Sequence, residues 1–188
     1  MKKLIMSFLV ILISAFCASS ALSAENTNVS ISAFSGDWHG GELAVQKPFG
    51  NSFGEFKLSG ADDGDGDSYF SADLVFGTEV FKNVSVFGGL TGGCRDGLGE
   101  RDYFNYVGIK VGAMLEVGPV YVKGWDTIAP PATKSTDYYY VAPAVEAGVK
   151  ISENFSFAVR ATGERRGIND RRVSFKETHI VGMVSFKF

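Results

Sequence analysis

Charged side chains recur two residues apart in stretches that otherwise alternate with apolar residues, and these charged groups have the most chemistry to offer. Side chains two positions apart share one face of an extended segment. By this spacing, a common inward face would carry Glu42, Gln46, Glu55, Lys57, Asp73, Lys110, Lys123, Glu146, Lys150, Arg160, Glu177 and His179. Acids and bases that meet in a narrow interior are expected to pair, because an unpaired charge there is costly. We therefore predict a polar network inside the protein.

Patterns that would indicate catalysis or a bound metal are incomplete in this chain. The segment Asp63–Asp67 spaces three carboxylates like the start of a calcium-binding loop, which then needs glycine at its sixth position and glutamate at its twelfth. Those positions hold Ser68 and Leu74. The two histidines, His39 and His179, lack the companions of a catalytic group. We predict a protein that is not an enzyme and uses neither a metal nor a cofactor.

The overall composition narrows the class of protein further. The 188 residues include 18 lysines and arginines against 21 acids, together with 23 glycines, 16 phenylalanines and 2 cysteines. The acidic excess argues against a nucleic-acid partner, since nucleic-acid binders usually present a basic face. The low cysteine content argues against a disulfide scaffold. The length favours one domain with a real core.

The first 24 residues have the layout of a secretory signal peptide. Two lysines precede the apolar run Leu4–Ile13, and small residues lead to Ala24. The run is short for a membrane-spanning helix, although an uncleaved anchor is the alternative. Cleavage after Ala24 would leave residues 25–188 as one exported domain, with Cys94 as its single thiol.

Alternation with a period of two runs through the rest of the chain. Phe70, Leu74 and Phe76 would lie on one face of a strand, and Asp73 on the other. Strands are expected at 28–36, 42–47, 53–61, 69–81, 84–93, 103–117, 119–126, 138–152, 155–163 and 173–188. Short turns at 47–52, 82–83, 118–119 and 153–154 alternate with polar loops at 37–41, 62–67, 94–102, 127–137 and 164–172.

Strand length and this rhythm of connections favour a membrane barrel over a soluble sandwich. A tilted membrane strand needs about 9–11 residues, and outer-membrane barrels join their strands by short turns on one side and longer loops on the other. In lipid the sheet must close on itself so that every backbone group is paired. We predict an all-β fold, a closed antiparallel transmembrane β-barrel of ten strands. Eight strands is the alternative, because the first two are short.

Aromatic residues gather near both ends of the expected strands, as they do at the two lipid–water interfaces of such barrels. Near the loops are Trp38, Tyr103, Phe104, Trp125, Tyr138, Tyr139 and Tyr140. Near the turns or the terminus are Phe49, Phe53, Phe81, Phe155, Phe186 and Phe188. We expect them to form two belts.

The chain ends in Val184–Phe188, with a terminal phenylalanine and apolar residues at alternate positions before it. This ending resembles the terminal signature of bacterial outer-membrane proteins. The resemblance implies that the barrel-insertion machinery recognises the last strand through Phe188, and that the protein lies in the outer membrane of a Gram-negative bacterium. The segment Leu58–Asp67, with the strand after it, is also similar to the YfaZ-like group of such barrels, which implies no particular activity.

Three classes of function remain open. A structural or porin-like barrel with at most a narrow pore for small solutes is favoured, because barrels of about eight strands are filled by side chains and open channels come at about 16. A surface adhesion protein acting through its loops is one alternative. A lipid-modifying enzyme is another, although Val181 stands where lipid A deacylases of this size carry a serine two residues after histidine.

The last expected loop contains four arginines: Arg165, Arg166, Arg171 and Arg172. Guanidinium groups suit phosphate, and the lipopolysaccharide outside such a barrel is rich in phosphate. We predict contact between these arginines and lipopolysaccharide. The alternative is a solvated loop in which Glu164 and Asp170 are their local partners.

Overall fold

The structure is a computed structural model that describes residues 27–63, 68–96, 103–130, 138–168 and 173–188. The predicted signal peptide, most of the acidic segment 63–67, and Arg171 and Arg172 lie outside these residues. No helix long and apolar enough to cross a membrane occurs within the described ranges.

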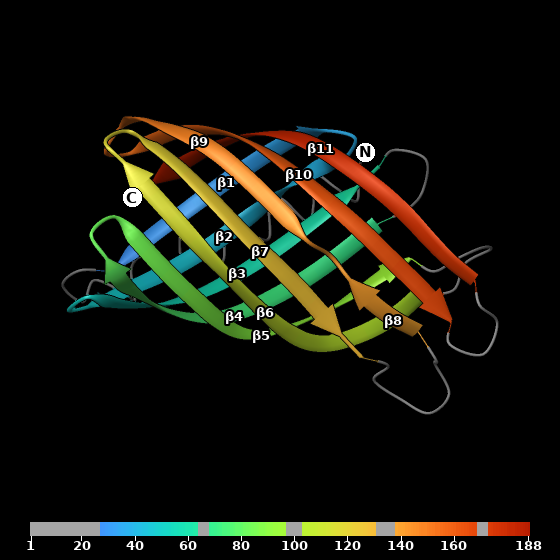
Figure 1. The fold of residues 1–188 in the computed structure, drawn as a ribbon. Coiled ribbons are helices and arrows are strands. Elements are labelled where there is room, and N and C mark those ends of the chain that lie inside the picture. Colours follow the sequence, from blue (N-terminus) through green and yellow to red (C-terminus); the bar gives the residue numbers. More distant parts are fainter. Residues whose placement is uncertain (1–26, 64–67, 97–102, 131–137, 169–172) are drawn as a thin grey trace.

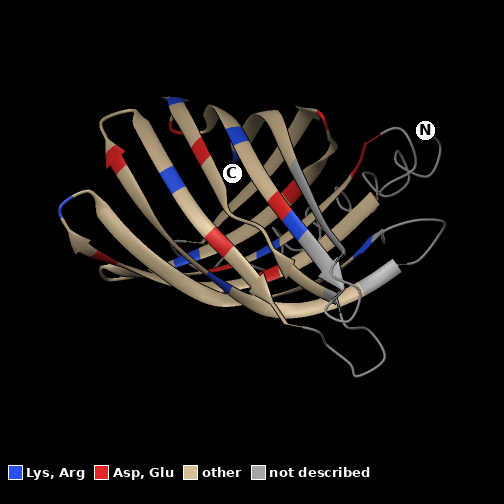
Figure 2. Cartoon of the chain, turned by 45° about the vertical axis from the view of Figure 1, so that its right-hand side comes forward, with Lys and Arg blue, Asp and Glu red and all other residues tan. Residues whose placement is uncertain are grey.

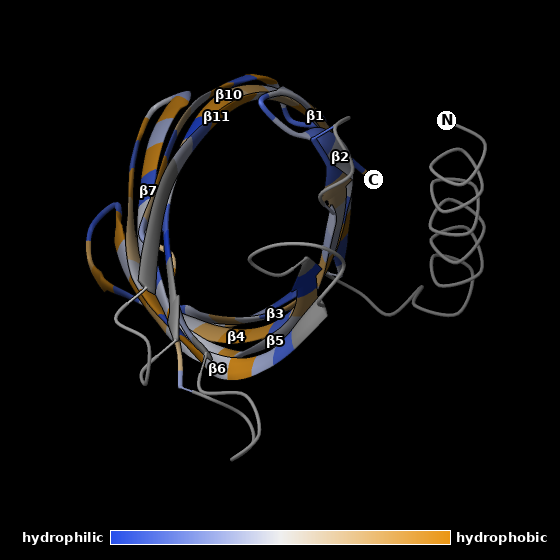
Figure 3. Cartoon of the chain, turned by 90° about the vertical axis from the view of Figure 1, so that its right-hand side faces the viewer, coloured by the Kyte–Doolittle hydropathy of each residue, from blue (hydrophilic) through white to orange (hydrophobic). Residues whose placement is uncertain are grey.

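The described chain folds into one antiparallel sheet that closes into a ring (Figures 1 and 3). Its strands are β1 (Asn28–Gly36), β2 (His39–Phe49), β3 (Ser52–Asp62), β4 (Ser68–Phe81), β5 (Val84–Asp96), β6 (Tyr103–Val117), β7 (Val120–Ala129), β8 (Tyr138–Val141), β9 (Ala144–Ser152), β10 (Phe155–Ile168) and β11 (Val173–Lys187). Neighbours in sequence are neighbours in the wall, and β1 pairs with β11 from Ser30↔Lys187 to Gly36↔Val181. That last pairing leaves no free edge, as a strand surrounded by lipid requires.

The short strands β8 and β9 occupy a single place in the wall, between β7 and β10. Pro143, which has no N–H to donate, interrupts them. The backbone bridges the gap, since Thr127 and Ala142 exchange two hydrogen bonds and Gly163 N donates to the Pro143 carbonyl at 2.8 Å. The wall therefore has ten strand positions. The prediction of ten is confirmed, and the alternative of eight is wrong.

The second strand is longer than the sequence indicated. The expected strand 42–47 extends to both ends of β2, because pairing with β3 continues from His39↔Asp62 to Phe49↔Ser52. The turn after it is only Gly50–Asn51, and Gly50 adopts a φ of 64° that favours glycine. The predicted loop 37–41 likewise shortens to Asp37 and Trp38. The other three turns are two residues each, at 82–83, 118–119 and 153–154, as predicted.

The two faces of the wall differ as the alternation predicted. Outward side chains such as Val107, which is 64% exposed, are apolar, whereas inward Asp73 is 2% exposed. Seen along its axis, the barrel is a ring of alternating polar and apolar residues (Figure 3). Charged residues lie along the strands themselves and are not confined to the connections (Figure 2).

The prediction of two aromatic belts is wrong for part of the loop-side set. Trp38 is only 5% exposed and Tyr140 only 8%, and both point into the barrel together with Trp125. Trp125 and Tyr140 lie in phase with the inward face of β7 and β8, and Trp38 lies in the short connection between β1 and β2. All three fill the interior. On the turn side, Phe49, Phe81, Phe186 and Phe188 are exposed, as predicted, whereas the prediction is wrong for Phe53, whose ring lies inside the barrel.

Large rings fit inside this narrow barrel because glycines lie opposite them on neighbouring strands. Phe53 pairs with Gly77, Phe87 with Gly112, and Tyr121 with Gly148. A Cβ atom on these three glycines would lie 2.3, 2.4 and 2.4 Å from the facing ring. In each of the three contacts, the ring packs over the glycine backbone of the adjacent strand.

Candidate functional site: the charged lumen

Arg160 on β10 forms the centre of the lumen, where it joins two acids from different parts of the wall. Its Nη1 and Nη2 donate to the two carboxylate oxygens of Glu42 on β2 at 2.6 and 3.1 Å. Its Nε and Nη2 donate to Glu146 Oε2 on β9 at 2.8 and 2.7 Å. All three side chains are buried. The fork geometry of arginine permits this double pairing, which a lysine could not reproduce.

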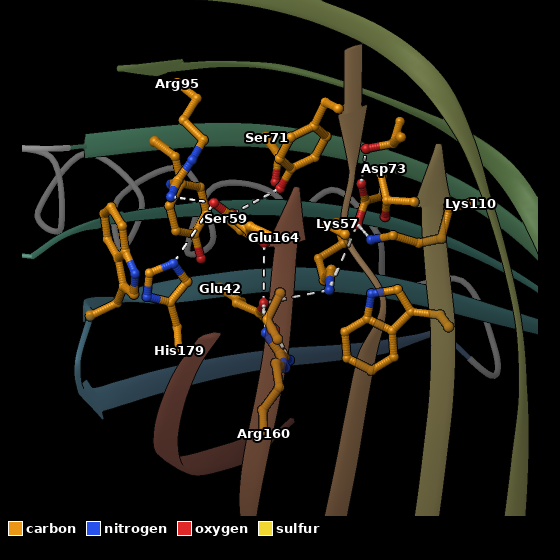
Figure 4. A pocket seen from close by; sticks show the side chains of 18 of the residues that line it. Glu42, Lys57, Ser59, Ser71, Asp73, Arg95, Lys110, Arg160, Glu164 and His179 are labelled. Carbon is orange, nitrogen blue, oxygen red and sulfur yellow. Dashed lines mark hydrogen bonds and ion pairs between the residues drawn. The ribbon is translucent and has the colours of Figure 1, made fainter. Parts of the chain in front are cut away.

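A third acid, Asp73 on β4, extends the network along the wall. The Lys110 ammonium donates to Asp73, and the Thr91 hydroxyl donates to its other oxygen at 2.7 Å. Lys57 Nζ lies 3.7 Å from Asp73 Oδ2 and 3.4 Å from Glu42 Oε1, so it links the two acids (Figure 4). We call Glu42, Lys57, Asp73, Lys110, Glu146 and Arg160 the central ion-pair layer.

Four cations surround the ring of Trp125. The charged groups of Arg160, Lys57, Lys110 and Lys123 lie 5.1, 5.8, 5.8 and 5.7 Å from its centroid. The electron-rich face of an indole attracts cations at such distances. Trp125 therefore supports the central layer, a role that the interface prediction missed. Its spacing of two residues from Lys123 was the signal in the sequence.

A separate cluster lies nearer the loops, centred on Arg95 of β5. Its guanidinium lies 2.5 Å from Glu164 Oε2 and covers the Trp38 ring at 4.6 Å. Glu164 also accepts a hydrogen bond from the Tyr140 hydroxyl at 3.0 Å, and His179 Nε2 lies 3.8 Å from it. Arg95 and Glu164 were assigned to loops from sequence, but β5 and β10 continue through them, so both point inward.

The predicted network residues thus divide into four groups. Lys57, Asp73, Lys110, Glu146 and Arg160 meet in the central layer, and His179 joins the Arg95 cluster. Glu55 and Lys123 line the lumen, but neither has an ion pair within the described residues. The side chain of Glu177 lies outside the described set.

The predicted lipopolysaccharide contact stays a prediction. Arg165 is exposed on β10. The backbone of Arg166 belongs to the same strand, but its side chain lies outside the description, as do Arg171 and Arg172 entirely.

Two spaces lie on either side of the central layer. A cavity of about 590 Å³ at the turn end, here called the vestibule, has the exposed residues Ser152, Glu153 and Asn154 at its rim. A smaller cavity of about 100 Å³ lies toward the loops. Glu42, Lys57 and Arg160 line both. The central layer is therefore the partition between them.

No group of three or more acids, histidines or cysteines within the described ranges could hold a metal ion. The described strands and their inward side chains together define a closed, antiparallel β-barrel with a charged lumen. A solved structure of the NanC porin is similar, with a TM-score of 0.52 and 11% identity, over 86% of this chain and 100% of that one. At this identity the similarity concerns the fold alone. No family model matches the chain, and no curated protein matches it, so the YfaZ-like resemblance stays a prediction.

Proposed function

We propose that the exported chain is an outer-membrane barrel of a Gram-negative bacterium that passes only small solutes. Its apolar outer face and its closed wall are suited to a lipid bilayer. The predicted signal peptide and the terminal Phe188 support export to that membrane. A porin of similar fold supports a transport role over a catalytic one.

The observation that carries the proposal is the partition of the lumen. Water-accessible space approaches the central layer from both sides, and the partition consists of side chains, not of backbone. A route that passes between side chains admits small solutes and excludes large ones. The barrel has ten strand positions, which is close to the size that side chains fill completely.

Removing the partition should widen the route. In planar bilayers we expect small current steps from the natural chain and larger steps from the variant Glu42→Ala/Glu146→Ala/Arg160→Ala. This triple substitution removes the three groups together, and Lys57, which loses Glu42, keeps Asp73 at 3.7 Å. The rim pair Glu116 and Lys150, at 2.6 Å and partly exposed, provides a control, since Glu116→Ala/Lys150→Ala should leave the current unchanged. Absence of current from both the natural chain and the folded triple variant would favour a purely structural barrel.

The membrane location has its own test. A closed barrel resists unfolding by detergent, so the unboiled protein from outer-membrane fractions should migrate differently on a gel from the boiled protein. Identical migration, or recovery of the chain in the soluble periplasmic fraction, would contradict the proposed location.

A further inference from the structure

Among the described residues, two half-buried charges of the lumen lie outside the network of ion pairs. Glu55 on β3 and Lys123 on β7 both line the vestibule, and both also line a small recess of about 10 Å³ in its wall. They are half-buried, and no ion pair joins either of them to another described residue. The other charges of the vestibule wall are paired, apart from Glu153 and Lys187, which are exposed at its rim.

The recess is built for a charged group of each sign. Its walls include the rings of Phe53, Phe87 and Trp125, and also three charged residues of the central ion-pair layer, Lys57, Asp73 and Lys110. The Lys123 ammonium lies 4.9 Å from the Phe87 centroid and 5.7 Å from the Trp125 centroid, which fixes its place at the recess. Glu55 interacts electrostatically with Lys57, and Lys123 with the two rings, but neither residue has an ion-pair partner among the described residues. A half-buried acid or base without an ion pair gains by binding an opposite charge.

A simple ion satisfies only one of these two residues. A simple anion on Lys123 would leave the Glu55 carboxylate of the same recess without an ion pair. A simple cation on Glu55 would leave the Lys123 ammonium without one. A ligand with one carboxylate and one ammonium satisfies both at once. The recess has room for about one water molecule, so the body of the ligand would occupy the vestibule, whose volume of about 590 Å³ is ample.

We propose that Glu55 and Lys123 form a binding site for a small zwitterion such as a free amino acid, with its ammonium on Glu55 and its carboxylate on Lys123. This inference rests on the proposed role as a small-solute barrel and names the class of solute. The site faces the turn end of the lumen, because both residues line the vestibule.

Binding can be measured without any current, through the fluorescence of Trp125. The chain has two tryptophans, and the second, Trp38, belongs to the Arg95 cluster. In the folded full-length chain carrying Trp38→Phe, L-alanine should change the Trp125 emission in a saturable way. Propionate and ethylammonium, which match alanine in size but carry one charge each, should have little effect at the same concentration. If Trp38→Phe does not fold, equilibrium dialysis of radiolabelled alanine against the natural chain gives the same comparison.

Substitutions then assign the site. Glu55→Gln and Lys123→Gln should each weaken alanine binding at least about tenfold, which equals about 1.4 kcal/mol. The rim substitutions Glu153→Gln and Lys187→Gln make the same chemical changes on exposed residues of the vestibule and should leave binding unchanged.

Three outcomes would overturn the proposal: no saturable alanine binding, equal binding of propionate or ethylammonium, or full binding by Glu55→Gln. These failures are separate from failure of the proposed function, since a barrel without measurable current can still bind alanine, and a conducting barrel can lack this site.

Discussion

Arg160 is the residue on which the central layer depends most. Its donors are divided between Glu42 and Glu146, so two buried acids share one cation for most of their compensation. Removal of one member of a buried ionic group leaves the others as uncompensated charges, which is costlier than removal of the whole group.

The variant Arg160→Met should therefore lose about 3–5 kcal/mol of unfolding free energy, because Glu146 would lose its cation and Glu42 would keep only Lys57, at 3.4 Å. Urea unfolding of the barrel in lipid vesicles measures this loss. Adding Glu42→Gln and Glu146→Gln to the same chain should restore most of it.

Lys150→Met supplies the comparison at an exposed ion pair. Its partner Glu116 remains in contact with water, so the loss should stay below about 1 kcal/mol. Equal losses for Arg160→Met and Lys150→Met would show that the central layer contributes no more than a surface pair.

At the scale of single residues, the sequence predicted which side chains face the lumen wherever polar and apolar residues alternate clearly along a strand. Asp73 and Lys110 stand between apolar neighbours, so a period of two assigned them to the lumen without any knowledge of their partners. That Arg160 reaches Glu42 was not predictable, because 118 positions separate the two residues and the contact follows from closure of the wall. Arg95 was missed because a charged residue beside a polar stretch suggests a loop.

Among the elements, the contacts between rings and glycines explain how adjacent strands approach each other inside the barrel. The register places Phe87 directly opposite Gly112, so the ring occupies the space where a side chain would otherwise be. The sequence indicated close approaches at these glycines, but it could not indicate which ring would fill each one.

Gly112→Ala should destabilise the barrel by about 1–3 kcal/mol, because the new methyl group would lie 2.4 Å from both the Phe87 ring and the backbone oxygen of Gly124, so that the ring and the adjacent strand would have to move. Unfolding in urea again gives the measurement. Gly124→Ala on the adjacent strand is the matched control, since the nearest atom to its new Cβ would be 3.9 Å away. The double variant Phe87→Leu/Gly112→Ala, in which the ring is replaced by a smaller side chain, should recover the part of the loss that the ring causes. Equal losses for Gly112→Ala and Gly124→Ala would contradict this explanation.

The elements themselves were largely predictable, and their boundaries less so. Two-residue turns at 82–83, 118–119 and 153–154 were found because the flanking alternation stops there. Pro48 suggested the end of a strand, yet it lies within β2 and pairs with Phe53. Pro143 was read as part of one continuous strand, and here the structure does break it. A proline interrupts pairing only where its missing N–H would have been used, and that depends on the neighbouring strand.

At the scale of the whole molecule, the backbone and the ring of Phe188 have different roles. Its backbone N donates to the Val29 carbonyl at 2.9 Å and so contributes to closure, whereas its ring is 71% exposed. The ring therefore contributes little to packing within the chain. If the barrel-insertion machinery recognises this ring, its loss should affect assembly more than stability.

We expect Phe188→Ala to lower the amount of folded barrel in cell outer membranes while leaving its urea midpoint in refolded vesicles nearly unchanged. Gel migration of unboiled membrane samples gives the first quantity. Phe81→Ala, which removes another exposed ring from the turn end, should change neither. Equal losses of assembly for Phe188→Ala and Phe81→Ala would argue against specific recognition of the terminus.

The pairing of β1 with β11 also constrains when the molecule can be completed. Ser32 and Ser185, whose hydroxyl groups lie 2.7 Å apart, come from opposite ends of the chain, and their strands seal the ring. Contacts between such distant residues form slowly. The ring cannot close until β11 has been synthesised, and a product cut short before β11 would keep two unpaired edges open to other chains.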